Sequence, residues 1–163
     1  MPFTPFHFGP SATIAFPLRG KIDIPIFILA NVAIDIEPLT VMILNLSYPL
    51  HGYAHSFLGG GLVGALWGIV AFKCKDILRG VMQFFGLKYQ TTIATAVISG
   101  ILGAFSHVLI DAPIYTDIKP FYPLIINPFY GLVSEKTMYL SCSASFIPAL
   151  LFYIKARNKQ NEG

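Results

Sequence analysis

The chain alternates long apolar runs with short polar stretches, and this pattern predicts helices. Four runs come close to or exceed the roughly 20 residues that cross a bilayer as a helix; they are Ile22–Leu46, Phe57–Phe72, Thr91–Ile110 and Met138–Ile154. A further segment, Phe3–Phe16, is aromatic and broken by prolines, and it predicts a short, partly inserted helix. We therefore expect one all-α domain over residues 1–163, an integral membrane helical bundle of about four transmembrane helices plus an N-terminal half-helix.

Composition supports the bilayer as the solvent of this chain. Hydrophobic residues make up 55% of it, charged residues only 12%, and the mean hydropathy is +0.65. These values lie outside the usual range of a soluble domain, which could not cover its surface with so few polar groups. No segment is typical of a nucleic-acid-binding module. We expect membrane lipids as partners and no nucleic acid.

The basic residues predict how the chain is oriented. Arg19 and Lys21 precede the first run, the basic amphipathic segment Lys73–Lys88 follows the second, and the tail Lys155–Lys159 follows the fourth. In a four-span chain these three places fall on one side, which the positive-inside rule assigns to the cytoplasm. We expect a multi-pass protein of the cell inner membrane.

Glycines in the second run predict close helix packing. Gly60, Gly64 and Gly68 recur every four residues, so they share one face of a helix. Small residues at this spacing let the backbone of a neighbouring helix approach closely inside a membrane. We interpret them as a packing stripe with no chemical role.

Two polar pairs stand out in this apolar sequence, His51-x-x-x-His55 and His107-x-x-x-Asp111. Residues four apart lie on one face of a helix, so each pair can direct two donors at one metal ion. The predicted topology puts all four side chains toward the outer face. His7 joins them if the half-helix climbs from the cytoplasmic edge into the bilayer.

Two carboxylates, Asp35 and Glu37, lie inside the first apolar run. An ionisable group in a membrane helix costs about 2.5–3.5 kcal/mol on insertion scales, so it usually has a partner. A divalent cation would be such a partner, because it neutralises carboxylates and binds neutral imidazole. Glu37 points away from Asp35 on a regular helix, unless a kink at Pro38 re-aims it.

These observations predict a divalent metal site, with zinc preferred and manganese, iron or nickel also suited to a mixed donor set. The predicted ligands are His7, Asp35, His51, His55, His107 and Asp111, and the predicted catalytic residues are Glu37, as general base, and Asp35. Such a site could hydrolyse a lipid-like or membrane-adjacent ester or phosphoester. A Ser/His/Asp triad built on Ser56 or Ser106 lacks the nucleophile-elbow context.

The order of these motifs resembles one known family, the YdjM-like inner-membrane proteins (domain of unknown function 457), which are regarded as metal-dependent hydrolases. The matching stretches are Met1–Pro10, Ala30–Pro38, Tyr48–Ser56 and Ser106–Asp111, together with Asp117–Phe121 and Asn127–Pro128 in the following loop. The resemblance implies the same metal ligands and the same reaction class. Two positions depart from it: Gly52 stands where relatives tend to have a basic residue, and Tyr115 where they tend to have a histidine.

Two alternatives stay open at the level of sequence. The buried His and Asp groups could relay protons or ions in a membrane binding or transport protein without hydrolytic activity. They could also form a purely structural polar cluster whose members hydrogen-bond one another.

Overall fold

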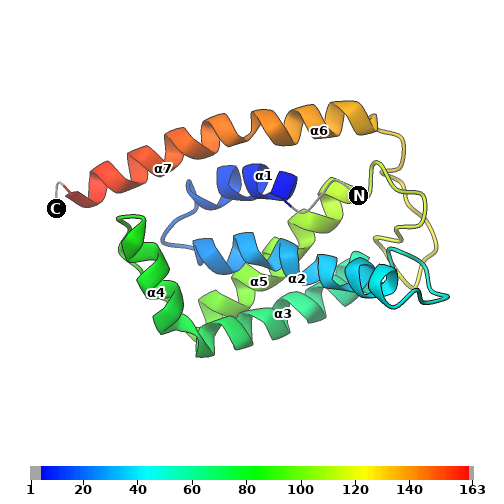
Figure 1. The fold of residues 1–163 in the computed structure, drawn as a ribbon, viewed down its shortest axis with the longest axis horizontal. Helices are drawn as coiled ribbons and strands as arrows, with labels where there is room; N and C mark the ends of the chain where they lie inside the picture. The colour runs from blue at the N-terminus through cyan, green and yellow to red at the C-terminus, as the bar shows by residue number, and fades with distance from the viewer. Residues whose placement is uncertain (1–4, 162–163) are drawn as a thin grey trace.

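The computed structural model describes residues 5–161, and over that range the chain is helical with no β-strand, which confirms the predicted all-α class (Figure 1). The first two residues of the predicted half-helix, Phe3 and Thr4, lie outside the described residues. The helices are α1 (Pro5–Ala15), α2 (Ile24–Ile43), α3 (Phe57–Lys73), α4 (Lys75–Phe84), α5 (Ile93–Asp111), α6 (Glu135–Ala144) and α7 (Phe146–Asn161), with a short 3-10 turn, η1 (Tyr53–His55), before α3.

Side-chain caps explain where the principal helices begin. The carboxylate of Asp23 accepts a hydrogen bond from the backbone N–H of Ile26 at the start of α2. The hydroxyls of Ser56 and Thr92 cap α3 and α5 in the same way. Each cap satisfies a backbone donor that the first helical turn leaves without a partner. The Ser56 cap matters most here, because it fixes the end of the loop that carries His55.

The centre of the bundle is the crossing of α3 and α5. A Cβ atom added to Gly64 would collide with the carbonyl oxygen of Gly100, and one added to Gly100 would collide with that of Gly64. Gly68 meets the backbone at Ala96 in the same way. The predicted glycine stripe is therefore a real close-packing surface, and its partner helix is α5.

Polar contacts link α2 to α3 and α1 to α2. Trp67 of α3 donates its indole N–H to the carbonyl of Ile26 in α2. Asn31 of α2 donates to the hydroxyl of Ser11 in α1, at 2.9 Å. Figure 1 shows α1 lying between α2 and the long α6–α7 rod, so α1 connects that rod to the rest of the bundle.

Three helices are long and apolar enough to cross a membrane: α2, α5 and the α6–α7 rod over Glu135–Lys159. The predicted second span, Phe57–Phe72, corresponds to α3, which meets the length criterion only together with α4. These two helices are bent by 79° at Cys74, so they form a fourth span only if a broken one is counted.

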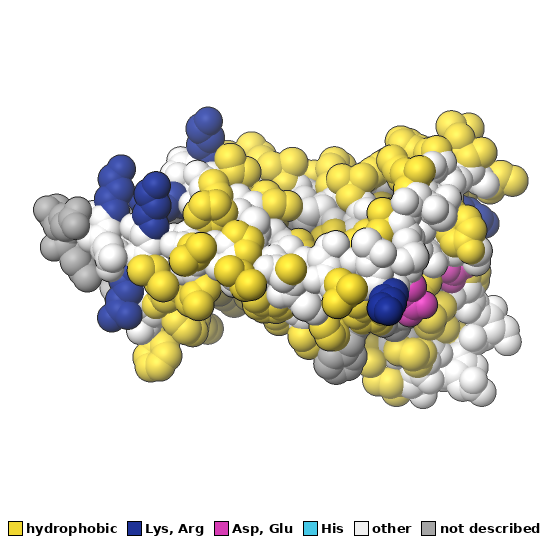
Figure 2. All heavy atoms as spheres, turned by 90° about the horizontal axis from the view of Figure 1, so that it is seen from above, with side chains coloured by type: hydrophobic (Ala, Val, Ile, Leu, Met, Phe, Trp, Pro, Cys, Tyr) yellow, Lys and Arg dark blue, Asp and Glu magenta, His cyan; other side chains and the backbone are white. Residues whose placement is uncertain are grey.

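The surface is apolar along the helices and basic at one end, as expected from the sequence. Large apolar side chains are exposed on α2, α4 and α7, including Ile43 at 70% and Phe84 at 85%. Figure 2 shows several Lys and Arg side chains gathered at one end of the molecule, with apolar side chains along its length. The basic end is the end where α4 and the C-terminal part of α7 lie (Figure 1).

We predict that Gly100→Val lowers the free energy of unfolding by about 1–3 kcal/mol, because the added methyl groups push α3 and α5 apart. Thermal unfolding of the purified protein in detergent measures the change. Gly80→Ala is the matched control, since a Cβ on Gly80 of α4 meets no atom within 4 Å. Equal melting temperatures for the two variants would contradict the close crossing.

Candidate metal centre

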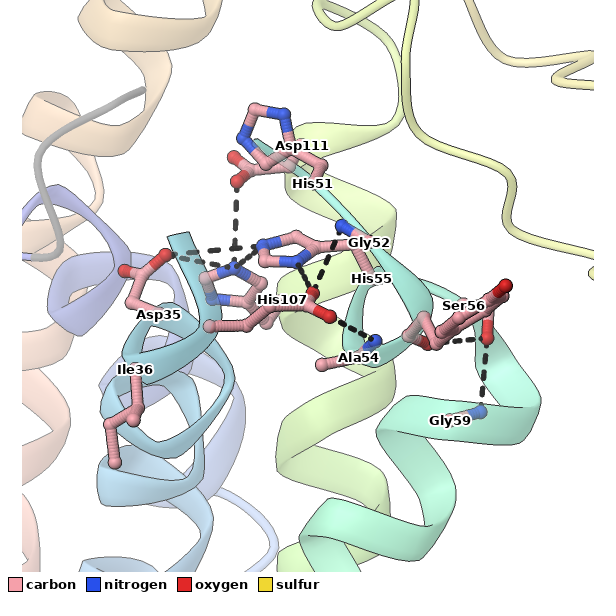
Figure 3. A network of polar contacts seen from close by, with 12 residues as sticks. Asp35, Ile36, His51, Gly52, Ala54, His55, Ser56, Gly59, His107 and Asp111 are labelled. Atoms are coloured by element: carbon pink, nitrogen blue, oxygen red, sulfur yellow. Dashed lines mark hydrogen bonds and ion pairs between the residues drawn. The ribbon is translucent and has the colours of Figure 1, made fainter. Parts of the chain in front are cut away.

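Four buried side chains from three parts of the chain meet near the end of the bundle opposite the basic end. Asp35 comes from α2, His55 from the end of η1, and His107 and Asp111 from the last turns of α5. Each offers one donor atom, and these four atoms lie within 4.8 Å of one another. Figure 3 shows the four side chains pointing toward a shared centre. We call this set the donor group.

The spacing inside the donor group matches the needs of a metal ion. His107 Nε2 lies 3.3 Å from His55 Nε2, 3.4 Å from an oxygen of Asp111 and 3.5 Å from an oxygen of Asp35. The separation between His55 Nε2 and Asp35 is longer, at 4.0 Å. Ligands about 2.1 Å from a tetrahedral ion lie roughly 3.4 Å from each other. The donor group could therefore hold a divalent metal ion.

Glu37 lies on the outer side of His55. Its carboxylate is 3.1 Å from His55 Nδ1, the ring nitrogen that faces away from the donor group. The same carboxylate accepts hydrogen bonds from the backbone N–H groups of Gly52 and Ala54, at 3.0 and 3.2 Å. A carboxylate in this place fixes the tautomer and the orientation of a metal-binding imidazole. Glu37 therefore orients His55, a candidate metal ligand. This role differs from that of general base, which the sequence predicted for Glu37.

His51, four residues before His55, also has its Nδ1 atom beside a carboxylate. Its Nδ1 is 2.9 Å from Asp117 Oδ1, and its backbone N–H donates to the other oxygen of Asp117. Its Nε2 is buried and has no hydrogen-bond partner among the described residues. The ring lies 4.7 Å from that of His55, centroid to centroid. Burial and the neighbouring His55 lower the pKa of His51, against the opposing effect of Asp117, which favours the neutral ring.

His7 contacts the donor group without belonging to it. Its Nε2 is 3.1 Å from Asp111 Oδ1, while the other oxygen of Asp111 faces His107. The His7 and His107 rings are stacked, with centroids 4.4 Å apart and planes 14° from parallel. The short helix α1 therefore brings His7 to the carboxylate of one donor and not to the centre itself.

The six predicted ligands are thus brought to one place but in two layers. The donor group contains Asp35, His55, His107 and Asp111, and His51 and His7 lie against it. Asp117 was not among the predicted site residues, because it lies in the proline-rich loop, 66 residues beyond its partner His51. No spacing rule could have connected the two.

The departure at Tyr115 is also part of this region. Its ring lies 4.4 Å from that of His51, centroid to centroid, and its hydroxyl is buried without a hydrogen-bond partner in the described part of the chain. A phenol at this position has one polar atom where an imidazole would have two. Tyr115 packs beside His51 and is not one of the four residues of the donor group.

A cavity of about 150 Å³ opens beside His51. Tyr53, Tyr122, Asp117 and Lys119 contribute to its walls. The rings of Tyr53 and Tyr122 meet edge to face at 4.8 Å. The cavity therefore leads from the surface of the loops to His51, and its walls are partly aromatic and partly charged.

Comparison with known proteins adds no further assignment. No protein-family model matches the chain, and no curated protein or solved structure does so either. The resemblance to the YdjM-like group therefore stays a prediction.

We predict that the purified protein binds zinc stoichiometrically and that Asp35→Asn or His107→Ala abolishes this binding. Glu37→Gln should weaken zinc affinity by about 10–100-fold, because it disturbs the orientation of His55 without removing a ligand. Metal analysis and competition with a chromogenic chelator give both numbers. Asp76→Asn, the same change at an exposed carboxylate of α4, is the control and should bind zinc like the unaltered protein.

Proposed function

We propose that this protein is a membrane-bound, metal-dependent hydrolase that acts on a lipid-like ester or phosphoester, as the YdjM-like resemblance implies. The observation that carries the proposal is the donor group: two buried imidazoles and two buried carboxylates whose donor atoms lie within 4.8 Å of one another. The other three donors lie 3.3–3.5 Å from His107 Nε2, close to the roughly 3.4 Å between the ligands of a tetrahedral divalent ion. Two carboxylates, Asp35 and Asp111, are buried in the donor group, and His55 and His107 share a hydrogen bond at 3.3 Å between them. A divalent cation bound there would neutralise the buried carboxylates, which are costly inside an apolar bundle.

Asp35, His55, His107 and Asp111 would hold the ion. A divalent ion there would need one coordination position left open for water or substrate, so three of these residues would bind it throughout and the fourth would yield or the ion would become five-coordinate. It would then supply Lewis acidity, which polarises an ester or phosphoryl oxygen and lowers the pKa of a bound water to about 7. Zinc is the preferred metal for mixed imidazole and carboxylate ligands in a four-coordinate group, and manganese, iron and nickel remain candidates.

His51 is the proposed proton acceptor. Asp117 fixes its Nδ1, so the free, buried Nε2 is the atom that can take a proton from an attacking water. Its position beside His55 places this nitrogen next to the donor group without making it a ligand. In this assignment Glu37 is a positioning residue for His55, and the role of general base moves to His51.

The surroundings suit a substrate with an apolar tail. An apolar groove of about 620 Å³ runs between α2 and α3 from Trp67 to Glu37. Tyr53 lines both this groove and the smaller cavity beside His51. An acyl chain in the groove would bring its polar end to the opening near His51, where Lys119 offers a positive charge.

We propose four spans, formed by α2, α3, α5 and the α6–α7 rod, with α4 outside the bilayer core and α1 as a half-helix of about 16 Å. The basic end then faces the cytoplasm of an inner-membrane protein, and the donor group lies toward the outer face. In this orientation α4, bent by 79° from α3, lies along the cytoplasmic membrane surface.

We predict that the zinc-loaded protein in lipid nanodiscs hydrolyses at least one member of a panel of phospholipid and isoprenoid phosphate esters. Removal of the metal by chelator should abolish the activity, and His51→Gln should lower kcat by about 100-fold or more with zinc content unchanged. Asp76→Asn is again the control. A metal-loaded protein that hydrolyses nothing but conducts protons or ions across vesicles in a pH-dependent way would instead establish the relay function.

The topology is tested with the chain's own cysteine. Cys74, exposed at the α3–α4 bend, should resist a membrane-impermeant maleimide in intact spheroplasts and react after permeabilisation. Lys136→Cys, made in a chain with Cys74→Ser and Cys142→Ser, should react without permeabilisation because it starts α6 on the outer side. Labelling of Cys74 in intact spheroplasts would overturn the proposed orientation.

A further inference from the structure

An uncharged, apolar stretch of chain lies at the end of the bundle that holds the donor group. Residues 120–134 belong to the connection between α5 and α6 and contain no Lys, Arg, His, Asp or Glu. Charged residues flank this stretch, with Lys119 before it and Glu135 and Lys136 after it. Figure 1 shows it, in yellow, at the end of the molecule opposite the basic end. We call residues 120–134 the neutral loop.

The neutral loop has an exposed apolar tip. Leu124, Ile125 and Ile126 are consecutive in sequence and are 61%, 76% and 56% exposed. Leu132, farther along the same loop, is 69% exposed. A contiguous apolar surface of this kind marks a site of contact with a membrane or with another molecule.

The neutral loop is attached to the ends of two helices by hydrogen bonds. The side-chain amide of Asn127 donates to the carbonyl oxygens of Ala112 and Tyr115, just after α5, at 2.8 and 3.2 Å. The carbonyl of Pro120 accepts a hydrogen bond from the backbone N–H of Phe57, the first residue of α3, at 2.8 Å. These bonds hold the tip in one place relative to the donor group.

The backbone of the tip determines how deep in a membrane it can lie. The N–H groups of Ile125 and Ile126 have no hydrogen-bond partner among the described residues. Irregular backbone of this kind does not occur exposed in the hydrocarbon core, because its polar groups would stay without partners there. At the level of the headgroups, water and lipid oxygens can accept such bonds. The tip therefore fits the headgroup level and not the bilayer centre.

A lipid surface is the partner that these features fit. The connection that contains the neutral loop joins two candidate spans, α5 and the α6–α7 rod, so the loop lies where both would leave the bilayer. The loop also contains Tyr122 and Tyr130, and tyrosine is enriched at the membrane–water interface. A charged soluble partner would find no opposite charge on the loop to recognise.

We propose that the neutral loop inserts into the leaflet beside the donor group, at headgroup level, and opens the cavity next to His51 directly onto lipid. Tyr122 of this loop forms part of the cavity wall together with Tyr53, and Lys119 lies at the start of the loop. A lipid would then reach His51 sideways from the leaflet, without passing through water. The proposal rests on the four spans proposed above and not on hydrolytic activity.

The experiment places the polarity-sensitive fluorophore NBD on Ile125→Cys, in the full-length chain with Cys74→Ser and Cys142→Ser. The labelled protein is reconstituted into phosphatidylcholine nanodiscs that hold a single copy each. Quenchers are a nitroxide on the lipid headgroup, a nitroxide at the end of the acyl chain, or iodide in the water. We expect the headgroup nitroxide to remove most of the fluorescence and the other two quenchers to remove little.

Three further label positions complete the test. Leu132→Cys, on the same loop, should give the same pattern as Ile125→Cys, so the result does not depend on one variant folding. Ile147→Cys, an exposed position of the α6–α7 rod, should be quenched most by the chain-end nitroxide, which checks that the rod is inserted. Lys136→Cys, just after the neutral loop, is the matched control and should be open to iodide.

Two results would overturn the proposal while leaving the spans intact, provided that Ile147→Cys responds to the chain-end nitroxide. Strong iodide quenching at Ile125→Cys and Leu132→Cys would show that the tip lies in water, or that it is covered by a second copy that single-copy discs exclude. Shielding from all three quenchers would show that the tip packs against the protein itself. No readout uses hydrolysis, so a failure of the hydrolase proposal is observed separately.

Discussion

The close approach of α3 and α5 is the constraint on which the rest of this structure depends. Helices in a membrane gain little from burying apolar side chains against one another, so their association relies on close packing. Gly64 and Gly100 allow backbone-to-backbone contact at the crossing. That contact brings the start of α3, and with it His55, beside the last turns of α5, which carry His107 and Asp111. A side chain at either glycine would widen the donor group.

Two histidines, His55 and His51, each have the Nδ1 atom of the ring paired with a carboxylate. Glu37 holds His55, and Asp117 holds His51, both through Nδ1. In each case the carboxylate also accepts a backbone N–H from the loop before α3. The loop is therefore anchored by the same carboxylates that orient the rings. Rigid ligands of this kind lower the cost of organising a metal site, because little freedom remains to be lost on binding.

The sequence predicted the parts of the site that regular helices carry. All four members of the donor group were among the predicted ligands. Helical periodicity pairs His107 with Asp111, and Asp35 stands out as a charge in an apolar run. His55 was predicted from its spacing to His51, although it lies in a 3-10 turn and the two are not on one α-helix. The sequence also predicted a change of element near Phe72, where the second apolar run gives way to the basic amphipathic segment Lys73–Lys88. The 79° angle between α3 and α4 was not predicted, since neither proline nor glycine stands at the junction. The partnership of Asp117 with His51 was also beyond prediction, because it depends on how an irregular loop folds back over the bundle.

Gly9 is packed closely against α6 and α7, and this contact couples α1 to the α6–α7 rod. A Cβ atom there would overlap the carbonyl of Cys142 in α6 and the ring of Phe146 in α7, so α1 and the α6–α7 rod are in direct contact. His7 lies two residues away on the same short helix and touches Asp111. If the α6–α7 rod shifted along the bundle, α1 would be displaced with it, because the two are in direct contact at Gly9. The imidazole of His7 would then move relative to Asp111, one of the two carboxylates of the donor group.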